Sequence, residues 1–231
     1  MVDVPDSFEA PALGDRILSL DKEKVAQFAS AMMRGFLKSE IIGVAKHFPG
    51  HGKANVDSHL ELPECDASLE ELRDLDLVPF RKVIRSKAAG IMSAHISFPK
   101  IDREFASSLS QKIIQNLLRN ELRYNGLLFS DDMEMGAIVE NYSLSDACLQ
   151  AIMVGTDHVL VCHDLETVLE IKNDILAKLQ SGMISLETIK ISLDRIIEYK
   201  NKFATIETLD FSEVEKIIGC EEHLAIADSI G

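Results

Sequence analysis

The sequence predicts an α/β fold with a parallel β-sheet, on three observations. Short apolar segments alternate with longer segments whose apolar residues recur every three or four positions, as in βαβ units. The short segments are apolar throughout, as expected of strands covered on both faces. Because parallel strands end at one edge of their sheet, the polar residues that end them should converge. These residues are Lys46-His47, His95, Asp131-Asp132 and His163.

The N-terminal third of the chain predicts one helix and one strand. Residues 1–20 carry two prolines and a glycine and are expected to be irregular. Asp21 can cap a helix that extends to about Lys38. The apolar run that follows predicts a strand over residues 41–46, and a His-rich loop then continues to about residue 65.

The second helix is predicted to begin at the capping box of Ser68 and Glu71 and to end near Lys87, with Pro79 as a kink or break. Further strands are expected over residues 90–94, 127–129 and 159–161, and further helices over residues 110–122, 145–154, 164–181 and 186–202. Residues 204–231 are weakly patterned, with apolar residues for one more short helix. We therefore expect a domain of residues 1–203 and a C-terminal tail of residues 204–231.

Composition narrows the functional class. The formal net charge is −14 and no basic stripe offsets it, so a nucleic-acid partner is not expected. No apolar run reaches about 18 residues, so no membrane span is expected, and the acidic N-terminus is not typical of a signal peptide. The four cysteines are far apart and form no CxxC pair, which fits a reducing cytoplasm: Cys65, Cys148, Cys162 and Cys220.

Two acidic groups are candidates for chemistry. Asp131 and Asp132 directly follow an apolar strand, where a carboxylate can be a nucleophile or a metal ligand, or can simply cap a helix. Asp57 lies two residues before His59, so its carboxylate could hold that imidazole in one tautomer, or both could belong to a solvated loop. The residues alone leave these alternatives open.

Other candidate groups are less specific. His47, His51 and His59 could bind zinc and support a metal hydrolase, but their spacing matches no compact zinc motif, and we expect no metal or cofactor. Lys46 at a strand end could hold a substrate hydroxyl or carboxylate, or lie solvated at the rim. Cys162 beside His163 is a possible thiol nucleophile that nothing else in the sequence supports.

Three segments together resemble glycoside hydrolase family 3, specifically its bacterial β-N-acetylhexosaminidases of cell-wall recycling. They are Lys46–Gly52 (KHFPGHG), Asp57–His59 (DSH) and Phe129–Met135 (FSDDMEM), in matching order and spacing. The resemblance extends from about Gly14 to about residue 200. It implies a (β/α)8 TIM-barrel fold and a cytoplasmic, retaining β-N-acetylglucosaminidase. It further implies that the substrate is N-acetylglucosamine linked to anhydromuramoyl peptide fragments.

The resemblance also assigns roles to individual residues. Asp131 falls at the nucleophile, and His59, oriented by Asp57, falls at the general acid/base, in place of the more usual second carboxylate. The expected sugar-binding residues are Lys46, His47 and Arg16, with His95 near the pocket. The residues after Arg16 read Ile17-Leu18-Ser19 rather than the family's Ser-Phe-Gly.

The family's first barrel strands have no counterpart before the Arg16 region, so we expect an incomplete barrel comprising its C-terminal half to two-thirds. An open barrel exposes sheet edges and apolar surface, which predicts self-association or a partner chain. A fragment, a split protein and an inactive remnant all fit the sequence. The functional alternatives are a catalytically inactive half-barrel that binds a sugar or a partner chain, and another family 3 β-glycosidase.

Overall fold

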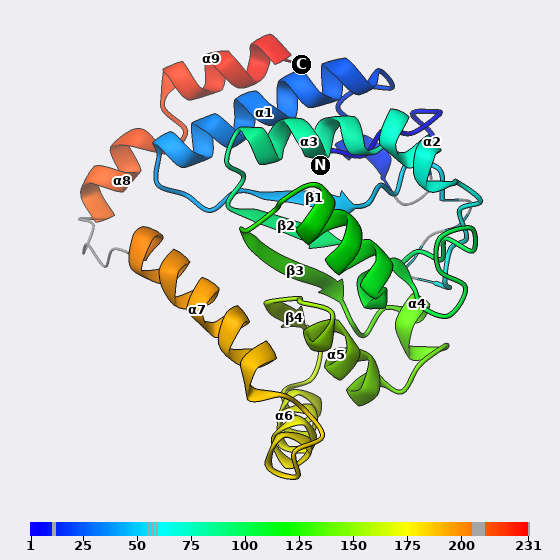
Figure 1. Ribbon diagram of the computed structural model, residues 1–231. Helices are drawn as coiled ribbons and strands as arrows, with labels where there is room; N and C mark the ends of the chain where they lie inside the picture. The colour runs from blue at the N-terminus through cyan, green and yellow to red at the C-terminus, as the bar shows by residue number, and fades with distance from the viewer. Residues whose placement is uncertain (11–12, 55, 57, 59, 205–210, 231) are drawn as a thin grey trace.

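The computed structural model describes residues 1–10, 13–54, 56, 58, 60–204 and 211–230. Its described strands form one parallel sheet in the order β1-β2-β3-β4 (Figure 1). Neighbours in the sheet are neighbours in sequence, so each connection crosses over through helical segments. The strands are β1 (Val44–Phe48), β2 (Gly90–Ser93), β3 (Leu127–Asp132) and β4 (His158–Leu160). Their carboxyl ends therefore lie at one edge, as the sequence predicts.

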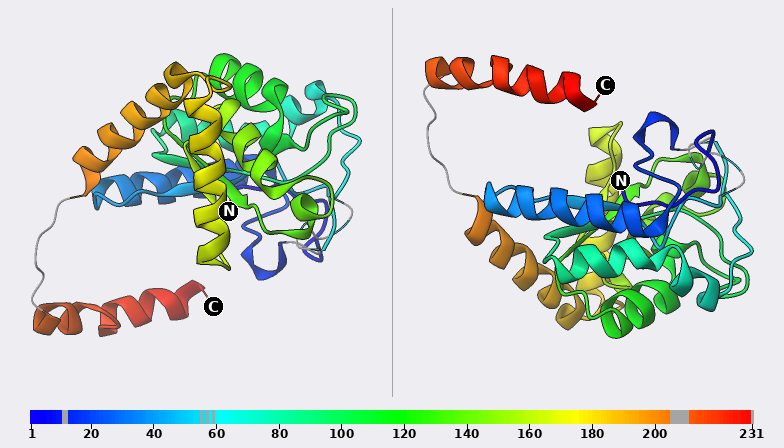
Figure 2. Two further views of the ribbon diagram at one scale, coloured as in Figure 1. Left: turned by 90° about the horizontal axis from the view of Figure 1, so that it is seen from below. Right: turned by 90° about the horizontal axis from the view of Figure 1, so that it is seen from above.

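Helices cover the sheet, and α1 packs beside α3 near β1 and β2 (Figures 1 and 2). Two helices at the C-terminus, α8 and α9, stand apart from the rest in both views of Figure 2. The described helices are α1 (Lys22–Lys38), α2 (Leu69–Asp74), α3 (Leu77–Arg85), a π-helix (Lys112–Glu121), α4 (Gly136–Val139), α5 (Leu144–Met153), α6 (Leu165–Gln180), α7 (Leu186–Phe203), α8 (Phe211–Ile217) and α9 (Glu221–Ile230). None of these helices is both long and apolar enough to cross a bilayer.

The main core lies between the sheet and the helices α1, α3 and the π-helix. The rings of Phe48 and Phe80 meet edge to face, with centroids 5.1 Å apart, and Ile91 and Leu128 are fully buried beside them. Such burial contributes about 1.5–3 kcal/mol for each large apolar side chain. Residues 2–4 also join this core, because the Val2 amide donates to the Lys46 carbonyl at 2.7 Å and lies beside β1.

Local capping signals in the sequence are confirmed. The Asp21 side chain accepts the amides of Glu23 and Lys24, each at 2.9 Å. Ser68 and Glu71 form the predicted capping box, and Ser185 caps α7. The predicted break at Pro79 is misplaced: α2 ends at Asp74 and α3 begins at Leu77. Pro79 then lies in the first turn of α3, where a missing N–H costs no helical hydrogen bond.

Several predicted element bounds are wrong for a shared reason. The first strand is Val44–Phe48 rather than residues 41–46, and the third continues to Asp132 rather than ending at residue 129. Parallel backbone pairing continues past the apolar residues, with Phe48 opposite Ser93 and Asp132 opposite Leu160. Backbone pairing does not require an apolar side chain, so the polar residues Ser130, Asp131 and Asp132 extend β3, and His47 with Phe48 extends β1.

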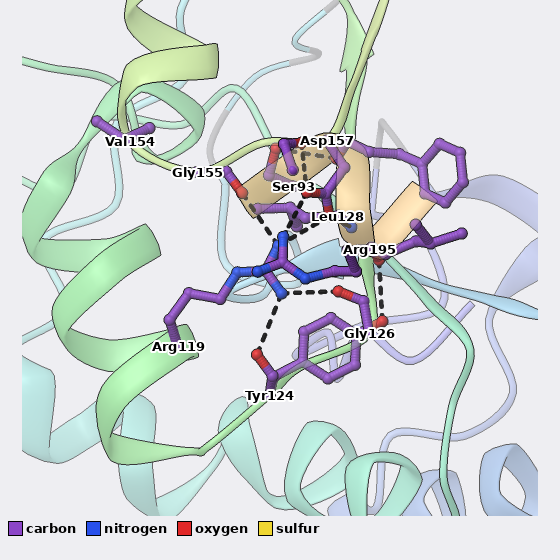
Figure 3. A network of polar contacts seen from close by, with 12 residues as sticks. Ser93, Arg119, Tyr124, Gly126, Leu128, Val154, Gly155, Asp157 and Arg195 are labelled. Atoms are coloured by element: carbon purple, nitrogen blue, oxygen red, sulfur yellow. Dashed lines mark hydrogen bonds and ion pairs between the residues drawn. The ribbon is translucent and has the colours of Figure 1, made fainter. Parts of the chain in front are cut away.

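The opposite edge of the sheet carries a buried ion network around Asp157, directly before β4 (Figure 3). Its Oδ2 accepts Arg119 Nη2 at 3.0 Å and the Leu128 amide at 2.8 Å. Its Oδ1 accepts the Ser192 hydroxyl at 2.7 Å and is paired with Arg195. The network thereby fastens α7 and the π-helix to the amino ends of β3 and β4.

Candidate active site

Asp131 lies at the carboxyl end of β3 with its carboxylate open to solvent. Its side chain is 23% exposed, and Oδ2 lies 3.7 Å from Nε2 of His47 on β1. Its Oδ1 accepts the Asp132 amide at 3.0 Å, which fixes one oxygen and leaves the other facing the imidazole. A carboxylate held this way, at the edge where α/β folds place their sites, can act as a nucleophile.

His47 is oriented by a residue far away in the sequence. Its Nδ1 lies 2.9 Å from Oδ2 of Asp3, and its backbone amide donates to both oxygens of Asp3, at 3.1 and 3.2 Å. Lys46 precedes His47 in β1 and is half-buried. The Lys46-His47 and Phe48-Pro49 peptide bonds are cis. The ring of His47 therefore stands between two carboxylates, those of Asp3 and Asp131.

Asp3 is the site residue that sequence reasoning missed. It lies in the stretch expected to be irregular, yet its side chain is fully buried. Burial would raise the pKa of Asp3, but the hydrogen bonds and charges of His47 and His51 outweigh it and hold the pKa below its ordinary value. The one available signal was an acidic residue between two apolar ones, Val2 and Val4, which does not reveal its partners.

His51 continues the same arrangement. Its amide donates to Oδ1 of Asp3 at 2.7 Å, and its Nε2 lies 3.0 Å from the hydroxyl of Ser58. Burial lowers the pKa of His51, with Asp3 partly opposing it and His47 adding to it. The imidazole is therefore predominantly neutral at neutral pH, and it connects Asp3 to a residue that lies between Asp57 and His59 in the sequence.

His95 holds the carboxyl end of β3 through a hydrogen bond to the backbone of Asp132. Its ring is buried, with Nδ1 at 2.7 Å from the Ser108 hydroxyl and Nε2 at 3.1 Å from the Asp132 carbonyl. Burial lowers the pKa of His95, with Asp131 opposing the shift, so the ring stays neutral. A neutral ring must donate from Nε2 to that carbonyl, so Ser108 donates to Nδ1. Both ring nitrogens are thus used within the protein.

The fourth strand end joins the same cluster. Nδ1 of His163 lies 3.2 Å from Oδ2 of Asp132 and 3.2 Å from Oε2 of Glu134. These three residues could offer ligand atoms to a metal ion, since the atoms lie within 4.8 Å of one another, but their mutual hydrogen bonds already account for the geometry. The predicted convergence of the four strand ends is confirmed by the contacts of His47, His95 and His163 with residues 131 and 132.

Two predicted site residues, Asp57 and His59, lie outside the described residues. Arg16 ends a short 3₁₀ turn and donates from Nε to the Leu13 carbonyl at 3.1 Å. Burial lowers the pKa of the Met1 amino group, Asp3 raises it, and the cations of Lys46 and Arg16 lower it. Arg16 and Lys46 thus both act electrostatically on the amino group of Met1.

The structure does not strengthen the two other hypotheses, a thiol nucleophile at Cys162 and a zinc site of three histidines. Partial burial, followed by the nearby charge of Asp132, raises the pKa of Cys162, so its thiol is not activated. The zinc set considered from sequence includes His59, outside the described residues. Of its other two members, His47 uses Nδ1 on Asp3 and His51 uses Nε2 on Ser58, while the buried Nδ1 of His51 has no hydrogen-bond partner among the described residues.

A parallel sheet with helices outside and a carboxylate–imidazole pair at its carboxyl edge defines a partial α/β barrel with its site in the usual place. The family model described as the glycosyl hydrolase family 3 N terminal domain matches residues 1–199. The chain belongs to glycosyl hydrolase family 3.

Named relatives support this membership. The chain is 31% identical over 221 residues to a β-hexosaminidase of Nitrosomonas eutropha, covering 95% of this chain and 60% of that protein. It is 37% identical over 164 residues to a β-hexosaminidase of Idiomarina loihiensis, covering 71% and 48% respectively. The chain thus spans about half to three-fifths of the length of these curated relatives.

Solved structures agree on the fold. A glycoside hydrolase family 3 β-N-acetylglucosaminidase from Paenibacillus sp. str. FPU-7 superposes with a TM-score of 0.86 at 34% identity, over 90% of this chain and 41% of that one. A β-glucoside phosphorylase superposes with a TM-score of 0.89 at 24% identity, over 97% of this chain and 42% of that one, and shows the fold alone. The predicted barrel-type fold, present in part, is confirmed.

Proposed function

We propose that this chain carries the catalytic residues of a retaining β-N-acetylglucosaminidase, with Asp131 as the nucleophile. The observation that carries the proposal is the geometry of Asp131, whose accessible carboxylate lies at the carboxyl edge of the sheet, 3.7 Å from His47. The names of the relatives support N-acetylhexosamine as the sugar. The resemblance described above supports anhydromuramoyl fragments as the remainder of the substrate.

In the proposed reaction, a carboxylate oxygen of Asp131 attacks the anomeric carbon as the glycosidic bond breaks. His59 donates a proton to the departing oxygen, and a covalent glycosyl-enzyme remains. Water then attacks the same carbon while His59 accepts its proton, which releases the sugar and regenerates Asp131. Lys46, His47 and Arg16 hold sugar hydroxyls, and Asp57 orients His59. The roles of residues 57 and 59 rest on the resemblance.

The proposal places the enzyme in the cytoplasm. The described cysteines all have free thiols, with Cys65 and Cys148 buried. Four unpaired thiols suit a reducing compartment better than an oxidising one. Peptidoglycan-derived fragments would have to reach that compartment before this chain could act on them.

The proposal is tested by measuring hydrolysis of an aryl β-N-acetylglucosaminide by the purified chain. We expect turnover, and we expect Asp131→Ala to reduce it by several orders of magnitude because no glycosyl-enzyme can form. Asp146→Ala, which removes an exposed carboxylate on α5, is the matched control and should keep full activity. A folded chain that does not hydrolyse the aryl β-N-acetylglucosaminide would contradict the proposal.

The acid/base role of His59 has its own test. His59→Ala should slow aryl glycosides with poor leaving groups far more than those with good ones, because good leaving groups need little protonation. The measurement is kcat/KM across a series of phenols of different acidity. An equal loss along the whole series would argue against proton donation by His59.

A further inference from the structure

We infer that Asp3 is the positioning residue of this site, and that its buried carboxylate selects the tautomer of His47 and anchors Ser58 through His51. The inference deepens the proposed function and rests on it for the catalytic consequence. It concerns a residue outside the recognised KHFPGHG, DSH and SDD segments. Among the described residues, the Asp3 carboxylate contacts His47 and His51 rather than the proposed nucleophile Asp131.

The buried carboxyl group of Asp3 is surrounded by hydrogen-bond donors. Three N–H groups converge on its two oxygens: the amide of His47, the amide of His51 and the ring Nδ1 of His47, at 2.7 to 3.2 Å. A fully buried carboxylate is stable as an anion only with such donors. The two amides can only donate, and with the ring N–H they give the carboxylate three donors, which favours its ionised form.

The ionised Asp3 selects the tautomer of His47. An ionised carboxylate oxygen at 2.9 Å requires a proton on Nδ1. In the neutral ring, Nε2 then carries a lone pair and is the nitrogen nearest Asp131. It can accept a hydrogen bond from a sugar hydroxyl without donating to the nucleophile. Asp3 thereby leaves Asp131 free to attack.

The contacts of Asp3 also lead to Ser58. The amide of His51 is fixed on Oδ1 of Asp3, and its ring meets the Ser58 hydroxyl at 3.0 Å. The carbonyl of Ser58 accepts the Ala137 amide at 3.3 Å, from the helix α4 that follows Asp131. Ser58 is buried and held from two sides. Asp3 thus anchors the chain between Asp57 and His59 to the same frame as the nucleophile.

An asparagine at position 3 cannot accept hydrogen bonds from both the ring Nδ1 of His47 and the amide of His51. If its carbonyl faces the His51 amide, its NH₂ group faces Nδ1 of His47 and makes that nitrogen an acceptor. The His47 proton then moves to Nε2, on the side of Asp131. In the flipped orientation, the NH₂ group opposes the His51 amide, donor against donor. The isosteric change Asp3→Asn therefore reverses the His47 tautomer or releases His51.

The test records the imidazole tautomers by long-range ¹H–¹⁵N NMR, in a chain with seven histidines. His47→Gln identifies the His47 signals. We expect Nδ1–H in the wild-type chain, a changed His47 pattern in Asp3→Asn, and no change in Asp6→Asn, an exposed acid in the same segment. A wild-type His47 with its proton on Nε2 overturns the inference, even if Asp3→Asn fails to fold.

The catalytic arm compares kcat and KM on the aryl substrate. We expect Asp3→Asn to lower kcat/KM by on the order of a hundredfold, and Asp6→Asn to leave it unchanged. Ser58→Ala should lower kcat while leaving the His47 spectrum as in the wild type, because it removes the hydrogen bond between His51 and Ser58 and leaves the contact between Asp3 and His47 in place. Wild-type activity in a folded Asp3→Asn chain overturns the positioning role.

The two arms separate this inference from the proposed function. A wild-type chain without turnover contradicts the proposed function, while the NMR comparison still decides whether Asp3 sets the His47 tautomer. Conversely, the chain could be active while the His47 spectrum is the same in wild type and Asp3→Asn. That result overturns the inference and leaves the proposed nucleophile role of Asp131 intact.

Discussion

Asp76 is a buried carboxyl group packed against the loop that follows β1. A Cβ atom added at Gly50 would lie 2.7 Å from its Oδ1, so the carboxyl directly abuts that loop. Burial raises the pKa of Asp76 to about 7, with Lys53 lowering it and Asp3 raising it further. The protonated form is therefore favoured by the fold well above the usual range of a carboxylic acid.

This shift predicts a specific pH dependence of stability. The folded chain retains a proton on Asp76 that the unfolded chain loses near its ordinary pKa of 3.8. The free energy of unfolding therefore falls as the pH rises from about 4 to about 7, by at most roughly 4 kcal/mol from this group. Asp76→Asn should match wild type near pH 4 and melt at a higher temperature near pH 7.5.

The control for this prediction is Asp74→Asn, which removes an exposed carboxylate at the end of α2. Its melting temperature should differ from wild type by similarly small amounts at both pH values. Thermal unfolding by circular dichroism at pH 4 and 7.5 is sufficient. An Asp76→Asn curve parallel to that of wild type would show that the Asp76 proton is not linked to folding.

Between secondary-structure elements, the Asp157 network is the strongest polar connection that the described residues show (Figure 3). Asp157→Asn should lower the free energy of unfolding by about 3–5 kcal/mol, because it leaves the mostly buried Arg119 without a compensating charge. Asp146→Asn breaks a surface pair with Lys178 and should cost less than about 1 kcal/mol. Denaturant titration measures both. Similar losses in the two variants would mean that the Asp157 network is not a main support.

The fold class and most helices could be predicted because their signals are local. Asp21, Ser68 and Ser185 cap helices through residues two or three positions away. Asp3 could not be predicted, because its partners lie 44 and 48 residues along the chain. Hydrophobic pattern cannot assign the polar rim residues of β1 and β3 to strands, because it marks apolar residues, whereas His47 and Ser130 are polar and yet buried. The resemblance supplied Asp131, and the structure supplied its neighbours.

The molecule as a whole presents apolar surface beside β4. A groove of about 300 Å³ is lined by Val159 of β4, by Val161 directly after it, and by Val168 and Leu176 of α6. Leu165 and Met183 are also largely exposed nearby in the sequence. In the part of the chain that the structure describes, β4 pairs only with β3. An open strand edge beside apolar side chains favours association.

We therefore predict that the chain self-associates through this groove. Sedimentation velocity from about 1 to 100 μM should show a concentration-dependent dimer or larger species. Leu176→Lys, within the groove, should weaken association at least about tenfold, by placing a charge in an apolar contact. Leu186→Lys, on an exposed residue that does not line the groove, should have little effect. A monomer across the whole range would contradict the prediction.

The strand β3 carries the Asp157 network at one end and Asp131, the proposed nucleophile, at the other. Leu128, whose amide is held by Asp157, and Asp131 are three residues apart, or about 10 Å along a strand. Substitutions at that separation usually combine additively. The two ends can therefore be engineered separately: we expect stabilising changes around Asp157 and α7 to raise the melting temperature without altering the proposed activity at the other edge.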